Sequence, residues 1–302
     1  MLTFIIHNRT AWSDYFTGSP NSTFSNEYGN RQTPSVTNVH FLNCLFISIT
    51  SSSNGGALYC NPVSCLLVES TFFFSCKTNG YSGGAIYFSN TGSGQCVFNK
   101  LCVYDCCTTG GNSGQFSYID VKNDATSKCY SNYSSFTRCV NENSNSWYIL
   151  AHWYGKHCYT SINSSNNKCG YRSGIYFCPF TDANSLTGSL TYSTFADNIA
   201  TNYNCIRFGT SGSKYEIKSC NILRNTQSST SEGTIYTRGN TMIEDSCILE
   251  NEATCIFYVS SSSYTITISN CTVDSTSNNG YLTTRNTVTK SFILALNHMS
   301  TH

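Results

Sequence analysis

Charged residues and prolines are scarce in this chain. Asp, Glu, Lys and Arg make up only 11% of its 302 residues, the formal net charge is +1, and there are four prolines. Nucleic-acid-binding proteins carry a concentrated basic face, and proteins that bind anionic membranes carry polybasic segments. Neither pattern occurs here, so we expect no nucleic-acid partner.

Long apolar runs and helical periodicity are missing as well. No stretch is long enough to cross a bilayer, so the sequence predicts no transmembrane segment, and the apolar run in residues 1–7 lacks the basic start of a secretory signal. No window combines helical spacing with capping residues. Instead, short strings alternate apolar and polar residues, as in Tyr264–Ser269. This pattern predicts an all-β protein with very little helix.

Cysteine, in contrast, is abundant. Eighteen cysteines are many for a cytosolic protein of this size and favour an oxidising compartment. We interpret the chain as a cell-surface or secreted segment separated from its own signal or anchor. The sequence leaves the membrane attachment, the oligomeric state and the completeness of the chain open.

Two columns of mainly apolar residues recur nine times with a shared period of roughly 28 residues. The first column contains Phe46, Phe73, Val103, Phe136, Asn166, Phe195, Ile222, Ile248 and Val273. The second contains Leu58, Ile86, Phe116, Ile149, Ile175, Ile206, Ile235, Ile256 and Leu282. Such a period predicts a solenoid over residues 38–282, whose stacked units bury a common core. Residues 1–37 are then an N-terminal cap or flanking segment, in which Trp12, Tyr15 and Phe16 are expected over the first coil. Residues 283–302, with the apolar run Phe292–Leu296, are a C-terminal cap or the start of a further coil.

Two short motifs recur within these columns. Gly55–Tyr59 reads GGALY, Gly83–Tyr87 reads GGAIY, and Phe195–Asn198 reads FADN. They resemble the GGA[IL] and FxxN repeats of the polymorphic membrane proteins of chlamydiae, and the Cys-rich variant is most similar to the related surface proteins of trichomonads. Over residues 38–282 the resemblance implies a single-stranded right-handed parallel β-helix of the pectin-lyase-like kind, with about nine coils and a cell-surface role, usually in adhesion. Trp147–Ile149 and Asn204–Ile206 depart from the motif because they lack the glycines.

Two further columns are polar or contain cysteine. Repeated Asn at a turn can bond the amide of the next coil, which predicts a ladder. Its expected members are Cys76, Cys106, Cys139, Cys169, Asn198, Asn225 and Asn251. A second cysteine column contains Cys65, Cys96, Cys129 and Cys158. Equivalent Cα atoms about 4.8 Å apart lie within disulfide range, so vertical bridges and a stack of reduced, buried thiols are both open. No spacing indicates a metal site, and no cofactor is expected.

Aromatic residues that follow the second column point outward if that column points inward. They are Tyr59, Tyr87, Tyr176, Tyr236 and Phe257. Stacked tyrosine rings can bind sugar rings or a protein of a host cell or matrix, and cross-coil packing is the structural alternative. His152, Trp153 and Tyr154, with the nearby His157, interrupt the repeat. They indicate either a bulging interaction loop or the buried filler of a widened coil.

An enzyme, a leucine-rich repeat and an inert spacer are the alternatives. The implied fold also carries polysaccharide lyases and glycoside hydrolases, whose sites need clustered carboxylates. The chain has no Asp-Asp, Asn-x-Asp, Gly-His-Gly or Arg-x-Lys, and its densest charged group is Asp120, Lys122 and Asp124. The uneven repeat steps and the scarcity of Leu argue against a leucine-rich repeat. We therefore expect a non-enzymatic adhesin that binds a host-cell protein or glycan, without a catalytic residue.

Overall fold

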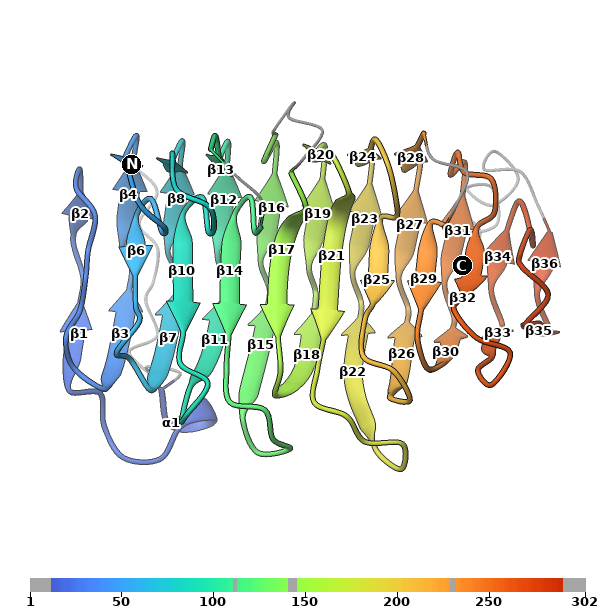
Figure 1. Cartoon of the computed structure of the whole chain (residues 1–302), viewed down its shortest axis with the longest axis horizontal. Coiled ribbons are helices and arrows are strands. Elements are labelled where there is room, and N and C mark those ends of the chain that lie inside the picture. Colours follow the sequence, from blue (N-terminus) through green and yellow to red (C-terminus); the bar gives the residue numbers. More distant parts are fainter. Residues whose placement is uncertain (1–11, 111–112, 141–145, 229–231, 290–302) are drawn as a thin grey trace, which may run out of the picture.

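Three parallel sheets wind the chain into a β-solenoid, as the repeat predicts (Figure 1). The computed structural model describes residues 12–110, 113–140, 146–228 and 232–289. Within them the only helix is α1 (Trp12–Tyr15). The eight-stranded sheet gives eight complete coils, near the expected nine, with part-coils at both ends.

Each complete coil contributes one strand to each of the three sheets, and the part-coils contribute to sheets A and B only. Sheet A contains β1 (Ser22–Phe24), β3 (Asn38–Leu42), β7 (Cys65–Glu69), β11 (Gln95–Asn99), β15 (Lys128–Asn132), β18 (Lys156–Thr160), β22 (Leu186–Thr191), β26 (Lys214–Lys218), β30 (Asn240–Glu244), β33 (Ile266–Ser269) and β35 (Leu282–Arg285). Sheet B contains β2 (Glu27–Tyr28), β4 (Leu45–Ile47), β8 (Phe72–Phe74), β12 (Cys102–Tyr104), β16 (Ser135–Thr137), β19 (Asn163–Ser165), β23 (Thr194–Ala196), β27 (Asn221–Leu223), β31 (Cys247–Leu249), β34 (Thr272–Val273) and β36 (Val288–Thr289). Sheet C contains β6 (Leu58–Tyr59), β10 (Ile86–Ser89), β14 (Ser117–Asp120), β17 (Tyr148–Trp153), β21 (Arg172–Cys178), β25 (Ile206–Phe208), β29 (Ile235–Thr237) and β32 (Phe257–Val259).

Two small sheets follow sheet B at the corner that leads to sheet C. One contains β5 (Thr50–Ser51), β9 (Lys77–Thr78) and β13 (Cys107–Thr108). The other contains β20 (Lys168–Cys169), β24 (Ile199–Ala200) and β28 (Thr226–Gln227).

The register confirms most of both apolar columns and corrects five positions. Ser164, not Asn166, lies between Phe136 and Phe195 in the first column. In the second column the equivalent residues are Ser117, Leu150 and Phe257 in place of Phe116, Ile149 and Ile256. Leu282 belongs to sheet A, where it pairs with Ile266.

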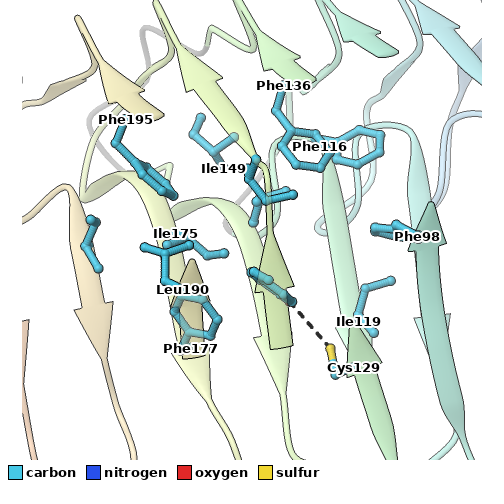
Figure 2. Packing of buried hydrophobic residues seen from close by; sticks show 14 of the residues in the cluster. Phe98, Phe116, Ile119, Cys129, Phe136, Ile149, Ile175, Phe177, Leu190 and Phe195 are labelled. Carbon is cyan, nitrogen blue, oxygen red and sulfur yellow. Dashed lines mark hydrogen bonds between the residues drawn. The ribbon is translucent and has the colours of Figure 1, made fainter. Parts of the chain in front are cut away.

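The error at Phe116 arises because a large and a small side chain have changed places between neighbouring positions of this coil. Phe116 lies where the second and third coils have Ala57 and Ala85, and it fills the core in their place. The small Ser117 then takes the column position and contacts His152 of the next coil, with its Oγ 2.8 Å from the imidazole Nε2. Figure 2 shows Phe116 beside Phe136 in the core. The sequence pattern therefore selects the large Phe116, which precedes the true column residue Ser117 by one position.

An asparagine ladder stacks four coils. Asn167, Asn198, Asn225 and Asn251 each follow the first column by three residues. The side-chain Nδ2 of each of the first three donates to Oδ1 of the next Asn, at 3.0, 2.9 and 2.9 Å. The same Oδ1 also accepts a hydrogen bond from the backbone N–H of the preceding Asn. Each Nδ2 also donates to a backbone carbonyl of the preceding coil. The expected ladder is confirmed, with Asn167 in place of Cys169.

The earlier coils have cysteine at the ladder position. The Cys76 and Cys106 thiols lie 3.5 and 3.7 Å from the carbonyl oxygens of Phe46 and Phe73, which correspond to the carbonyls that the Asn side chains bond. Cys139 connects the two halves, because its backbone N–H donates to Asn167 Oδ1 at 2.9 Å. A thiol thus takes over one of the several hydrogen bonds of the amide.

The other predicted cysteine column contains one neighbouring pair. Cys96 and Cys129 are in register and buried, whereas Cys65 pairs with Gln95 and Cys158 with Tyr130. Cys65 packs on the outside of sheet A, so these four residues do not form a stack. All eighteen cysteines are free thiols in the structure.

The corners are built from residues in the left-handed conformation. A single such residue separates sheet A from sheet B in ten coils, at Asn43, Ser70, Lys100, Tyr133, Ser161, Tyr192, Ser219, Asp245, Asn270 and Asn286. Before sheet C, Gly55, Gly83 and Gly114 have φ values near 70°. A Cβ atom on the following Gly84 would lie 1.9 Å from the Gln115 carbonyl oxygen, so the second glycine permits close stacking of coils.

The stack of coils extends beyond residues 38–282 at both ends. Strand β1 lies within the predicted N-terminal cap or flanking segment, and β35 and β36 agree with the predicted alternative of a further coil after residue 282. Helix α1 does not cover the first coil: Trp12 and Phe16 pack on Leu67 and Val97, on the outer face of sheet A. The Tyr15 hydroxyl accepts a hydrogen bond from Asn132 Nδ2 at 2.9 Å. The run Phe292–Leu296 lies outside the described residues.

Candidate binding face

An outward-facing column of aromatic residues runs along sheet C. The register aligns Tyr59, Tyr87, Tyr118, Ala151, Tyr176, Arg207, Tyr236 and Tyr258. We call this set the outer column. Figure 1 shows its strands side by side along the rod. Phe257, expected in this column, is buried, and Tyr258 takes its place.

The first three tyrosines of the outer column stack on one another. Ring centroids are 5.4 Å apart for Tyr59 and Tyr87, and 5.3 Å apart for Tyr87 and Tyr118, with planes tilted by 7° and 10°. Neighbouring rings cover the two faces of Tyr87, so only its edge and hydroxyl face outward. Burial raises the pKa of Tyr87, so its phenol stays protonated at neutral pH. The stack is therefore cross-coil packing that presents hydroxyl groups.

A polar hollow lies at the start of the outer column. It is lined by Arg31, Tyr59, Tyr81 and residues of the two turns at 52–54 and 79–80. The Arg31 guanidinium lies 5.1 Å from the centre of the Tyr59 ring and donates to Ser51 Oγ at 2.8 Å. Tyr81 is 70% exposed, so its ring is free to contact a ligand. We call this feature the Arg31 hollow.

A second concentration of aromatic and arginine residues lies at the same corner, five coils along. Trp147, Tyr171 and Tyr203 stack in series, with centroids 5.1 and 4.9 Å apart. Tyr148 and Tyr176 stack at 4.5 Å on the adjoining face of sheet C. Arg172 lies against both stacks, and its Cζ is 5.1, 5.7 and 5.0 Å from the ring centres of Tyr148, Tyr176 and Tyr203. These six residues are the Arg172 cluster.

A partly buried ion pair adjoins the Arg172 cluster. The Arg207 guanidinium donates through Nη1 to both carboxylate oxygens of Glu232, at 3.0 and 2.7 Å, and lies 4.0 Å from the centre of the Tyr236 ring. Asn204 Nδ2 donates to the same carboxylate at 2.5 Å. Burial opposes the charge of Arg207, but the Glu232 carboxylate raises its pKa overall.

The predicted trio at residues 152–154 is separated in the structure. His152 belongs to β17 and is buried, with its Nδ1 against the Tyr159 hydroxyl, and Tyr154 packs against the core. Burial lowers the pKa of His152 and lowers that of His157 to about 3, so both imidazoles are neutral. Trp153 alone lies on the outer face, 4.9 Å from Tyr176. The histidines are thus buried fillers, and no bulging loop forms here.

The acidic residues are separated along the structure. Asp124 pairs with Lys122 at 2.8 Å and accepts the Ser127 amide at 2.7 Å, so it stabilises its own turn. Asp120 is half-buried on the outer face, which raises its pKa, and its closest polar contact is Ser89 Oγ at 3.5 Å. Among the described residues, no three His, Cys, Asp or Glu side chains are arranged to hold a metal ion.

Sequence reasoning found four tyrosines of the outer column and Trp153, but it missed the arginines. Trp147, Tyr171 and Tyr203 precede their column residues Leu150, Ile175 and Ile206 by unequal steps, and the register shifts between Tyr148 and Leu150. A fixed repeat therefore cannot align them. The only signal is the local density of aromatic residues around Arg172.

Comparisons with family profiles, curated proteins and solved structures gave no match to this chain. Within the described residues, no helix has the length and apolar character needed to span a membrane.

Proposed function

We propose that this protein is a non-enzymatic cell-surface β-solenoid that binds glycans or proteins of a host cell or matrix. The observation that carries the proposal is the gathering of stacked Tyr, Trp and Arg side chains on sheet C and its adjoining corner. Aromatic residues and Arg are enriched where proteins bind partners, and the rigid sheet holds them in fixed positions. The resemblance to the polymorphic membrane proteins supports the adhesive role.

The dispersal of the carboxylates supports a role without catalysis. Glycoside hydrolysis needs two carboxyl groups on either side of one bond. Glu232 is held by Arg207, Glu69 contacts His40 at 3.1 Å, and Asp124 stabilises a turn. Among the described carboxylates, only Asp120 combines a raised pKa with a position on the outer face, so it is the residue on which the alternative of a carbohydrate-active enzyme rests.

A retention assay tests the proposal. The purified protein is incubated with a polysaccharide panel and with fixed epithelial cells, and both retained protein and released sugar are recorded. We expect retention without products, and weaker retention after Tyr81→Ala or Trp147→Ala. Tyr133→Ala is the matched control, because Tyr133 is 62% exposed at the corner between sheets A and B. Product release that is lost in Asp120→Asn would establish the enzyme instead, and failure of retention on every surface would favour an inert spacer.

A further inference from the structure

Arg172 is a buried cation without an anionic partner in the part of the chain that the structure describes. The residue is only 7% exposed, and its side-chain Nε is buried without a hydrogen bond. No carboxylate of the described residues lies within ion-pair distance of its guanidinium group. Arg31, Arg138 and Arg238 also have no carboxylate partner within the described ranges, but they are at least partly exposed and remain solvated. Burying an unpaired charge is costly, so the position of Arg172 needs an explanation.

The surrounding charges show what is missing. Among the residues that the structure describes, the corner around Arg172 contains two guanidinium groups, those of Arg172 and Arg207, and one carboxylate, that of Glu232. Glu232 attracts Arg172 at longer range, but it is engaged by Arg207 through two hydrogen bonds and forms no ion pair with Arg172. The three tyrosine rings around Arg172 attract its guanidinium group through cation–π interactions, but they carry no negative charge. One further anionic group would balance the corner.

We propose that Arg172 binds an anionic group of an acidic polysaccharide, a carboxylate or a sulfate, with the indole of Trp147 as the neighbouring sugar platform. Trp147 is 41% exposed at the end of its aromatic stack, so part of its indole is accessible to a sugar. The Arg207–Glu232 pair shows, one coil away, how a guanidinium at this corner holds such a group, because its Nη1 lies within hydrogen-bond distance of both carboxylate oxygens.

The Arg31 hollow favours a polymer over a small anion. It lies at the same corner, and its guanidinium likewise has hydroxyl but no carboxylate partners among the described residues. Five successive strand pairings lead from Gln32, the neighbour of Arg31, to Ile175, which follows Arg172 in β21. Arg31 and Arg172 are therefore five coils, or about 24 Å, apart along the rod. A linear polyanion can contact both arginines at once, which a single small anion cannot do.

The inference rests on the proposed function, and the test separates the two. Binding of the intact protein is measured by biolayer interferometry at low and moderate salt. Comparing hyaluronan with its methyl ester measures the contribution of the carboxylate to binding. Comparing dextran sulfate with dextran measures the contribution of the sulfate. Polyglutamate is the protein-like polyanion. We expect at least tenfold tighter binding to one acidic glycan than to its neutral counterpart. Arg172→Gln should remove most of that difference between the acidic glycan and its neutral counterpart.

Matched variants exclude a general charge effect. Arg138→Gln removes the same charge from an arginine that lies 5.6 Å from the Tyr104 ring centre, beside sheet B, and it should retain binding. Combining Arg31→Gln with Arg172→Gln should weaken polymer binding beyond either change alone. Equal losses for Arg138→Gln and Arg172→Gln would overturn the inference, as would equal binding to polyglutamate. Binding to cells or neutral glycans without a preference for acidic ones would refute the inference and leave the proposed function intact, whereas no binding to any surface would refute both.

Discussion

Removing one member of the asparagine ladder should destabilise the rod strongly. Asn198 is fully buried, and its side chain makes four hydrogen bonds. In Asn198→Ala the buried backbone amide of Asn167 loses its acceptor, which costs about 1–3 kcal/mol, and the three other lost bonds add about 1 kcal/mol each. The free energy of unfolding should therefore fall by about 4–6 kcal/mol. Asn198→Cys should lie between the alanine variant and the native protein, because Cys106 shows that a thiol can approach the equivalent carbonyl.

Urea unfolding, followed by far-UV circular dichroism, measures this loss. The control is Asn163→Ala in the preceding coil, where the exposed Asn163 side chain makes only a 3.5 Å contact with Ser135 Oγ and should contribute less than about 0.5 kcal/mol. Hydrogen exchange at the Asn167 amide supplies a local measure and should accelerate in Asn198→Ala. If both alanine variants unfold at the same urea concentration, the ladder does not stabilise the coils and the reasoning is wrong.

Three further predictions concern the corner, the buried histidines and the thiols. Tyr192 has a φ of 52° and is 65% exposed, so Tyr192→Asn should raise stability by about 0.5–1 kcal/mol by urea unfolding, and a decrease would contradict the strain argument. Because burial lowers the pKa of His157 to about 3, the unfolded chain binds a proton that the folded chain does not between about pH 6.5 and 3. Stability should thus fall with decreasing pH by about 1.4 kcal/mol per unit from this group, and the slope of urea stability against pH should be shallower in His157→Gln. Among the cysteines only Cys102 is exposed, so mass spectrometry should find it modified first by a thiol reagent in the native protein, whereas early modification of Cys60 or Cys129 would contradict their burial.

The fold was predictable because a solenoid repeats the same local requirement in every coil. Buried residues such as Phe46 and Phe73 must stack in register, and the glycine pair before Ala57 and Ala85 must admit a close neighbour. Those requirements leave periodic traces in the sequence. The Asn ladder is periodic for the same reason, since each amide needs an equivalent partner one coil away.

The binding face was only partly predictable because it depends on the residues that break the period. The register shift between Tyr148 and Leu150 changes the spacing between the corner and the buried strand. The contact between Arg172 and Tyr203 joins two turns of different construction, and no repeat relates them. Tyrosines that follow the buried column were found by alternation alone, but arginines at the corner required the three-dimensional arrangement.

The ladder and the Arg172 corner occupy the same part of the rod, which couples stability to binding. Asn167, Asn198 and Asn225 belong to the coils that also contribute Arg172, Arg207 and Glu232. The Arg207–Glu232 pair forms between two coils and needs them in fixed register; without it Glu232 would be free to neutralise Arg172. Asn198→Ala should therefore weaken binding of the acidic polysaccharide at temperatures where the chain is still folded. A substitution in the ladder's cysteine half, Cys106→Ala, lowers stability without disturbing this corner and should preserve the binding. Equal losses of binding in the two variants would show that global stability alone governs the site.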